Sequence, residues 1–197
     1  DPRIGLGRQL NEMGLTGESV CDDRAWVVRT HFPAQLGWKP VNARRAILLV
    51  RNPCDVVDSY FNMLLTQSHN LGIHEDDYNV QRAQWHEFVR EETEMWRSFN
   101  DFWLNSGVPL IVIRYEQLLL DRVSTLDKTL TFMANGRAEL LSDWRGMLSE
   151  MAAAGNWKTT YTPGTGGICR SLRHYPRILM AELGCSEKLA KTMDRFG

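Results

Sequence analysis

The sequence predicts an α/β fold, in which helices cover a parallel sheet. Three short apolar runs, residues 25–29, 46–50 and 110–114, have the composition of interior strands that are buried on both faces. Longer stretches with helical periodicity separate these runs, and this alternation is typical of α/β layering. The 197 residues, 43% of them hydrophobic, are enough for one sizeable core, so we predict a single domain over residues 1–197.

The overall charge limits the classes of partner. A formal net charge of −1 argues against general attraction to nucleic acid or to an anionic membrane, so any anion site has to be local. The sequence has no apolar run long enough to span a bilayer. Its four cysteines lie far apart and form no CxxC pair, so we expect no metal site.

A helix is predicted after the second apolar run, because Asn52 is a good N-cap and Pro53 fits the first helical position. Helical spacing puts one set of apolar side chains on the core side of this helix: Val56, Val57, Tyr60, Phe61, Leu64 and Leu65. The opposite stripe is polar and contains Asp55, Asp58, Ser59, Asn62 and Thr66. Ser59 is therefore expected to face away from the core.

Further helices are predicted on either side of the third run. A long amphipathic helix is expected from about residue 80 to 106, and we interpret its aromatic stripe, which includes Trp85, Trp96 and Trp103, as core packing. Helices are also expected over 118–133 and 138–154, and from Ser186 onward. Between the last two, residues 161–167 (YTPGTGG) have the composition of a flexible loop.

Arg51 lies where an anion site is expected, between the end of a buried strand and the start of a helix. Free backbone N–H groups and the helix dipole favour an anion there, and a guanidinium adds paired hydrogen bonds. Ser59 follows two helical turns later on the polar stripe and could share one phosphate with Arg51. The alternative is a surface salt bridge between Arg51 and Asp55, with Ser59 an ordinary solvated serine.

His31 follows another predicted strand, at the sheet edge where α/β folds bind ligands. Its imidazole titrates near neutral pH and can take a proton from a hydroxyl nucleophile. Arg29, two residues earlier, is expected on the same side of the strand, where it could stabilise negative charge on a transferred group. A purely structural role for the histidine is the alternative.

Three segments resemble sulfotransferases. Residues 27–33 (VVRTHFP) resemble the KTHLP segment of that family, and residues 51–60 (RNPCDVVDSY) resemble its RNPxDxxxSYY segment. Residues 114–119 (RYEQLL) are similar to its YEDL element. Within the family, residues 61–70 (FNMLLTQSHN) and 171–175 (SLRHY) look closest to sulfotransferase-like domains attached to WSC domains.

The resemblance implies a three-layer P-loop-like fold with a parallel central sheet flanked by helices. It also implies transfer of a sulfuryl group from 3′-phosphoadenylyl sulfate (PAPS) to a hydroxyl or amine of a small-molecule, glycan or protein acceptor. The product nucleotide would be 3′-phosphoadenosine 5′-phosphate (PAP), and no metal is needed.

Five residues take roles by position in the matched segments. His31 becomes the general base, and Arg29 stands where the family has a lysine near the transferring group. Arg51 and Ser59 become ligands of the donor 3′-phosphate, and Tyr115 is expected near the nucleotide.

The sequence departs from the family at two places. A PKSGTTW-like loop for the 5′-phosphosulfate is absent and would be expected before Asp1, so we expect an N-terminally truncated domain. In the late RKGxxGDWK element, residues 155–158 (GNWK) resemble the tail, but Glu150, Met151 and Ala152 replace the basic head. Arg170 or Arg173 is predicted to supply the missing cation.

Two other functions stay open at this point. A chain without the phosphosulfate loop could be a non-catalytic PAP-binding module. A P-loop kinase relative is disfavoured because the sequence has no GxxxxGK[ST] segment. The oligomeric state also stays open. The family resemblance allows two locations, which are the lumen of the Golgi, for a membrane-anchored parent protein, and the cytoplasm.

Overall fold

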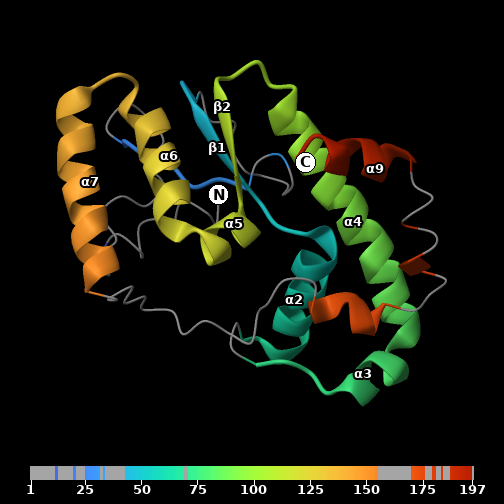
Figure 1. Ribbon diagram of the computed structural model, residues 1–197. Helices are drawn as coiled ribbons and strands as arrows, with labels where there is room; N and C mark the ends of the chain where they lie inside the picture. Colours follow the sequence, from blue (N-terminus) through green and yellow to red (C-terminus); the bar gives the residue numbers. More distant parts are fainter. Residues whose placement is uncertain are drawn as a thin grey trace. The chain divides into compact units, whose positions relative to one another are not determined.

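A computed structural model describes residues 12, 20, 25–31, 33, 43–68, 71–154, 170–175, 179–180, 183 and 187–196 (Figure 1). The chain divides into two compact units, Asp1–Arg44 and Arg45–Gly197. The second unit contains both strands of the described sheet and the helices that surround them.

The sheet consists of two parallel strands, β1 (Ala46–Val50) and β2 (Leu110–Arg114). Ala46 pairs with Leu110 at one end, and Val50 pairs with Arg114 at the other. These strands are the second and third predicted runs, and they confirm the α/β class. Because the strands are parallel and in register, Arg51 and Tyr115 leave the sheet from the same edge.

The predicted strand over residues 25–29 is wrong. Residues 25–31 form no regular element, and Trp26 and Val27 are each 61% exposed. A strand needs hydrogen bonds to a neighbouring strand, and the described residues of the first unit contain no second strand to supply them. Apolar composition is therefore not sufficient to make a strand here.

Three helices connect β1 to β2: α2 (Pro53–Thr66), α3 (Glu75–Val80) and α4 (Arg82–Leu104). The start of α2 is as predicted, because the Asn52 side chain accepts the Cys54 N–H at 2.9 Å and Pro53 takes the first helical position. The helix ends where Gln67 adopts a left-handed conformation with φ 52°.

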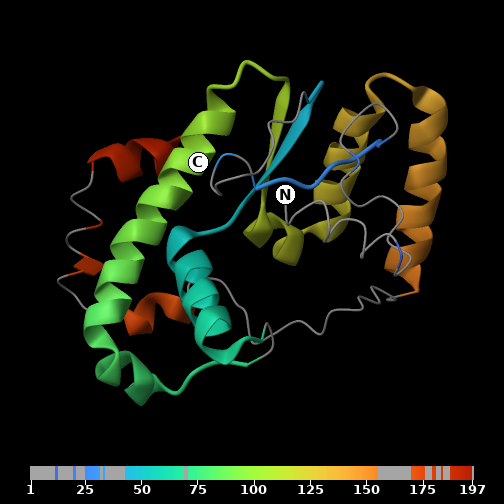
Figure 2. The same cartoon turned by 180° about the vertical axis from the view of Figure 1, so that it is seen from behind.

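After β2 follow α5 (Tyr115–Leu120), α6 (Arg122–Ala134), α7 (Ala138–Ala153), the 3-10 helix η1 (Arg170–His174) and α9 (Glu187–Asp194). The single helix predicted over 118–133 is thus two helices. Asp121 separates them, since its side chain accepts the Ser124 N–H at 3.2 Å and caps α6. Figure 1, and the reverse view in Figure 2, show α4 with α9 and α6 with α7 on opposite sides of the two strands.

Two hydrophobic clusters hold the second unit together. One lies between α2, α3 and α4 and includes the buried side chains Val57, Phe61, Trp85 and Val89. The other packs Leu48 and Val50 of β1 against Trp103 of α4, with Trp96 and Phe99 partly buried beside them. The predicted packing role of the aromatic stripe is confirmed for these side chains.

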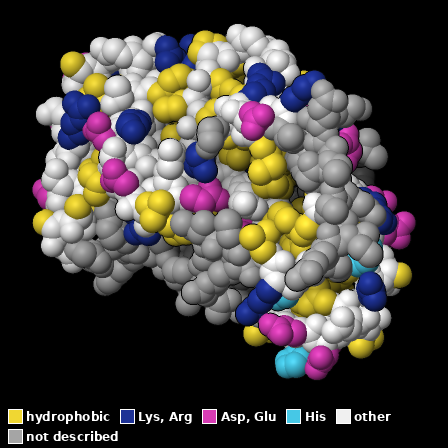
Figure 3. Space-filling view, turned by 45° about the vertical axis from the view of Figure 1, so that its right-hand side comes forward, with side chains coloured by type: hydrophobic (Ala, Val, Ile, Leu, Met, Phe, Trp, Pro, Cys, Tyr) yellow, Lys and Arg dark blue, Asp and Glu magenta, His cyan; other side chains and the backbone are white. Residues whose placement is uncertain are grey.

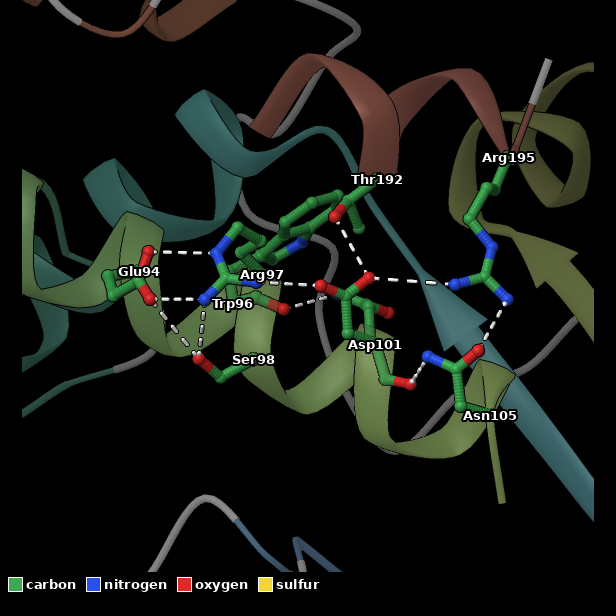
Figure 4. A network of polar contacts seen from close by, with 9 residues as sticks. Glu94, Trp96, Arg97, Ser98, Asp101, Asn105, Thr192 and Arg195 are labelled. Atoms are coloured by element: carbon green, nitrogen blue, oxygen red, sulfur yellow. Dashed lines mark hydrogen bonds and ion pairs between the residues drawn. The ribbon is translucent and has the colours of Figure 1, made fainter. Parts of the chain in front are cut away.

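A polar network fixes α9 against α4 (Figure 4). The Asp101 carboxylate accepts hydrogen bonds from Arg97 at 2.7 Å and from the buried Thr192 hydroxyl at 2.9 Å. Arg195, just after α9, donates to the carbonyl of Leu104 at 3.3 Å. The end of the described chain is therefore tied to the helix that packs on the sheet.

The described surface carries both signs of charge. On the face drawn in Figure 3, basic and acidic side chains are interspersed among hydrophobic ones. None of the described helices combines the length and apolar character that crossing a bilayer requires.

Candidate functional site

Arg51 is the centre of the candidate anion site, at the junction between β1 and α2. Its guanidinium carbon lies 4.7 Å from the centre of the Tyr115 ring, which makes a cation–π contact. Its Nε atom is buried and has no hydrogen-bond partner among the described residues. No acidic side chain in the described part of the chain forms an ion pair with Arg51, so the alternative of a salt bridge with Asp55 is not what the structure contains.

The peptide that carries Arg51 is fixed from two sides. The Trp96 indole N–H donates to the Arg51 carbonyl at 3.1 Å, and the Asn52 N–H donates to the Glu116 carboxylate at 2.9 Å. Both partners were missed from the sequence. Glu116 follows Tyr115 within a segment already singled out, whereas Trp96 looks like any other member of the aromatic stripe.

The physical properties of this junction favour an anion. A buried N–H that belongs to a cation costs free energy unless an acceptor reaches it. The dipole of the 14-residue helix α2 adds positive potential at the same end. The junction is therefore suited to a phosphate or sulfate oxygen.

Ser59 lies on α2 two turns after this junction, and its side chain is exposed, as predicted. The rest of the predicted polar stripe behaves differently. Asp55 is 1% exposed and Asp58 is 8% exposed, so the prediction that both face away from the core is wrong. The reason is that residues 171–175 pack over this stripe and offer hydrogen bonds to the two carboxylates.

Of the two arginines predicted to supply the missing cation, the structure describes the side chain of Arg173 only. The Arg173 side chain is 68% exposed, and its Nε lies 3.4 Å from a carboxylate oxygen of Glu75 on α3. The same Nε donates to His174 Nε2 at 3.1 Å. Arg170 is the first residue of η1. The structure thus brings Arg51 and Tyr115 together but does not bring Arg173 into contact with either.

Arg29 and His31 are in contact within the first unit. Arg29 Nη2 lies 3.0 Å from His31 Nε2. A guanidinium can only donate, so Nε2 is the acceptor and the imidazole is neutral. Burial, followed by the positive charge of Arg29, lowers the pKa of His31. The ring is therefore poised to be unprotonated at neutral pH, as a proton acceptor must be.

Comparisons with known proteins found a family match and a curated relative. The family described as Sulfotransferase domain matches residues 22–164. WSCD family member CG9164 of Drosophila melanogaster is 28% identical over 127 residues, which are 63% of this chain and 39% of the relative. The chain thus spans about two fifths of that relative's length. No solved structure matches the chain.

Proposed function

Because this chain belongs to the sulfotransferase domain family, we propose that it binds PAPS and takes part in moving the sulfuryl group to a hydroxyl or amine acceptor. In this proposal Arg51 and Ser59 bind the donor 3′-phosphate, and Tyr115 holds the Arg51 guanidinium in place. Arg170 or Arg173 adds a further cation. The acceptor is a small molecule, a glycan or a protein.

The observation that carries the proposal is the state of Arg51. Its charged side chain is packed on an aromatic ring at a helix N-terminus, and its buried N–H has no partner in the part of the chain that the structure describes. A phosphate oxygen would supply the missing acceptor and would also be stabilised by the helix dipole.

His31 is proposed as the general base, and its protonation state suits this role. The acceptor oxygen attacks sulfur, the bond from sulfur to the phosphate oxygen breaks, and the acceptor proton passes to His31 Nε2. In the structure that nitrogen accepts a hydrogen bond from Arg29. Arg29 must therefore give way to the acceptor hydroxyl, which frees its guanidinium for the negative charge on the transferring group.

Calorimetric titration with PAP tests the donor site, with adenosine 5′-phosphate as the control nucleotide that lacks the 3′-phosphate. We expect a preference for PAP that Arg51→Ala weakens by about 2 to 3 kcal/mol, the scale of hydrogen bonds to a charged group. Arg145→Ala is the matched control, because Arg145 is an exposed arginine that pairs with Asp127. Equal affinity for both nucleotides in the unmodified chain would contradict the proposed donor site.

A second measurement distinguishes the enzyme from a binding module. Release of PAP from PAPS is followed with and without a panel of simple alcohols, phenols and amines. Acceptor-dependent release that His31→Ala abolishes supports the enzyme. A PAP preference without any such release supports the non-catalytic module instead.

A further inference from the structure

The peptide bond between Arg51 and Asn52 is held at both ends by side chains from distant parts of the sequence. Its carbonyl accepts the Trp96 indole N–H at 3.1 Å, and its N–H donates to the Glu116 carboxylate at 2.9 Å. The C=O and N–H groups of a trans peptide point in opposite directions, so Trp96 of α4 and Glu116 of α5 hold the junction between β1 and α2 from opposite sides. We call Trp96 and Glu116 the Arg51 clamp.

The contact with Glu116 continues the register of the sheet beyond its last backbone pair. Strands β1 and β2 end together, so one residue further Arg51 is opposite Tyr115, and two residues further Asn52 is opposite Glu116. The chain turns into α5 at Tyr115, and the Glu116 side chain accepts the N–H that a continuing strand would have paired. The two chains therefore stay side by side where the Arg51 guanidinium meets the Tyr115 ring.

The clamp also holds the N-cap of α2. The Asn52 side chain accepts the Cys54 N–H at 2.9 Å, and the Asn52 carbonyl accepts the Val56 N–H at 3.0 Å. The backbone N–H groups of Asn52, Cys54 and Val56 thus already have acceptors within the protein. Recognition of an anion at this junction falls mainly to the Arg51 guanidinium, whose Nε–H lacks an acceptor among the described residues.

A guanidinium recognises a phosphate through paired hydrogen bonds only when it points in one direction. Tyr115 restrains the tip of the Arg51 side chain, and the clamp restrains the peptide from which that side chain starts. Without the clamp, the peptide could rotate and the guanidinium would populate several directions. The affinity for a phosphate would then fall with the fraction of molecules in the binding direction.

We propose that Trp96 and Glu116 are positioning residues that direct the Arg51 guanidinium toward the donor 3′-phosphate. This inference rests on the proposed function, in which Arg51 binds that phosphate. It gives a role to two side chains that the proposed function does not place against the nucleotide or the acceptor. The role of Glu116 is to accept the Asn52 N–H, so its hydrogen bond matters and its negative charge does not.

The test compares variants of the full chain by the ratio of their PAP affinity to their adenosine 5′-phosphate affinity. Partial unfolding lowers both affinities by the same factor, whereas a misdirected Arg51 lowers the PAP affinity alone. Glu116→Ala should lower the ratio about tenfold, because it removes a charge-assisted hydrogen bond. Trp96→Phe keeps an aromatic ring but removes the N–H, and should lower the ratio about fivefold.

Each variant has a matched control. Trp85→Phe removes another indole N–H of α4, which donates to the His174 carbonyl at 3.0 Å. Asp121→Ala removes a carboxylate that accepts a backbone N–H at the start of α6. Both controls should leave the ratio within about twofold of the unmodified chain, because they lose similar hydrogen bonds away from Arg51. Glu116→Gln keeps an acceptor for the Asn52 N–H and should also stay within about twofold.

A double variant tests whether the clamp acts through Arg51. Glu116→Ala should cause no further loss of the ratio when it is combined with Arg51→Ala, because the side chain that it positions is already absent. A second loss of about tenfold in the double variant would show that Glu116 acts on the phosphate independently of Arg51, which contradicts the inference.

The inference is also wrong if either Glu116→Ala or Trp96→Phe keeps the ratio of the unmodified chain, or if the controls lower it equally. A loss in Glu116→Gln as large as in Glu116→Ala would mean that the charge matters, which contradicts the positioning role. Circular dichroism identifies a variant that fails to fold, and the other clamp variant then decides.

Arg51→Ala distinguishes failure of the inference from failure of the proposed function. If Arg51→Ala loses the PAP preference while Glu116→Ala and Trp96→Phe keep it, only the inference is wrong. If Arg51→Ala keeps the preference, the proposed donor site is wrong and the inference fails with it.

Discussion

The Arg51 guanidinium owes its position to the ring beneath it. Tyr115 follows β2 directly, and its ring lies 4.7 Å from the guanidinium carbon. A flat ring holds a flat cation while leaving its N–H groups available, which a salt bridge does not do. The contact therefore orders the cation without neutralising it.

Tyr115 supplies the first prediction. Tyr115→Leu should weaken PAP binding by about 1 kcal/mol, the scale of a cation–π contact at a partly exposed site. Tyr115→Phe keeps the ring and should bind PAP like the unmodified chain. Calorimetry on both variants checks this, and equal losses in the two would show that the hydroxyl, not the ring, matters.

His31 supplies the second prediction at the residue scale. Burial is the larger cause of its lowered pKa and the charge of Arg29 the smaller. The ring should therefore titrate below the ordinary histidine value of about 6.5. Because the pKa of His31 is lower in the folded chain than in the unfolded chain, protonation of His31 favours unfolding. Its contribution to the free energy of unfolding is therefore complete above the ordinary histidine pKa and is lost as the pH falls through the lowered folded pKa.

Removing the charge of Arg29 should shift this titration in a known direction. Arg29→Ala should raise the pKa of His31, since a positive neighbour no longer opposes the imidazolium, but burial should keep the value below the ordinary one. Arg29→Lys keeps a charge and serves as the control. Ring proton resonances followed by NMR across the pH range give the midpoints, and an identical midpoint in all three chains would mean that the Arg29–His31 contact does not form in solution.

At the scale of elements, the features predicted correctly are those that depend on residues close together in the sequence. Asn52 and Pro53 marked the start of α2, because a cap depends on the next few residues only. Asp55 and Asp58 were misplaced, because their burial depends on Ser171 and His174, more than a hundred residues away. Helical periodicity contains no information about which distant segment will cover a polar stripe.

The same limit applies to the strands and to the site. The runs that form β1 and β2 were predicted, and they pair, whereas the equally apolar run 25–29 has no partner strand among the described residues. Arg51 was predicted because its position in sequence, between strand and helix, already defines its chemistry. Trp96 was not, because nothing in an aromatic stripe reveals which indole N–H meets the Arg51 carbonyl.

The attachment of α9 gives a prediction at this scale. Thr192→Val removes the hydroxyl that donates to Asp101 while keeping the shape of a buried side chain. We expect the free energy of unfolding to fall by about 1 kcal/mol, the usual net value of one hydrogen bond. Thr129→Val is the matched control, because the Thr129 hydroxyl donates to the Thr125 carbonyl of its own helix. Urea denaturation of both variants measures the difference, and equal stability losses would contradict the role of the Asp101 network.

At the scale of the whole molecule, the proposed roles follow the division of the chain into two units. The residues proposed to bind the donor, including Arg51, Ser59 and Tyr115, belong to the unit Arg45–Gly197, and those proposed to handle the acceptor proton, Arg29 and His31, belong to Asp1–Arg44. Each pair of contacting residues, Arg51 with Tyr115 and Arg29 with His31, is formed within a single unit. Binding and proton transfer should therefore respond to different substitutions.

This separation gives the last prediction. His31→Ala should leave the affinity for PAP within about twofold of the unmodified chain, because no donor contact is lost, while acceptor-dependent release of PAP from PAPS should disappear. Arg51→Ala should instead weaken PAP binding, because it removes a proposed contact with the donor 3′-phosphate. Calorimetry and the release measurement on the same two preparations provide the comparison. If His31→Ala weakened PAP binding as much as Arg51→Ala does, His31 would belong to the donor site, and its assignment as the base would be wrong.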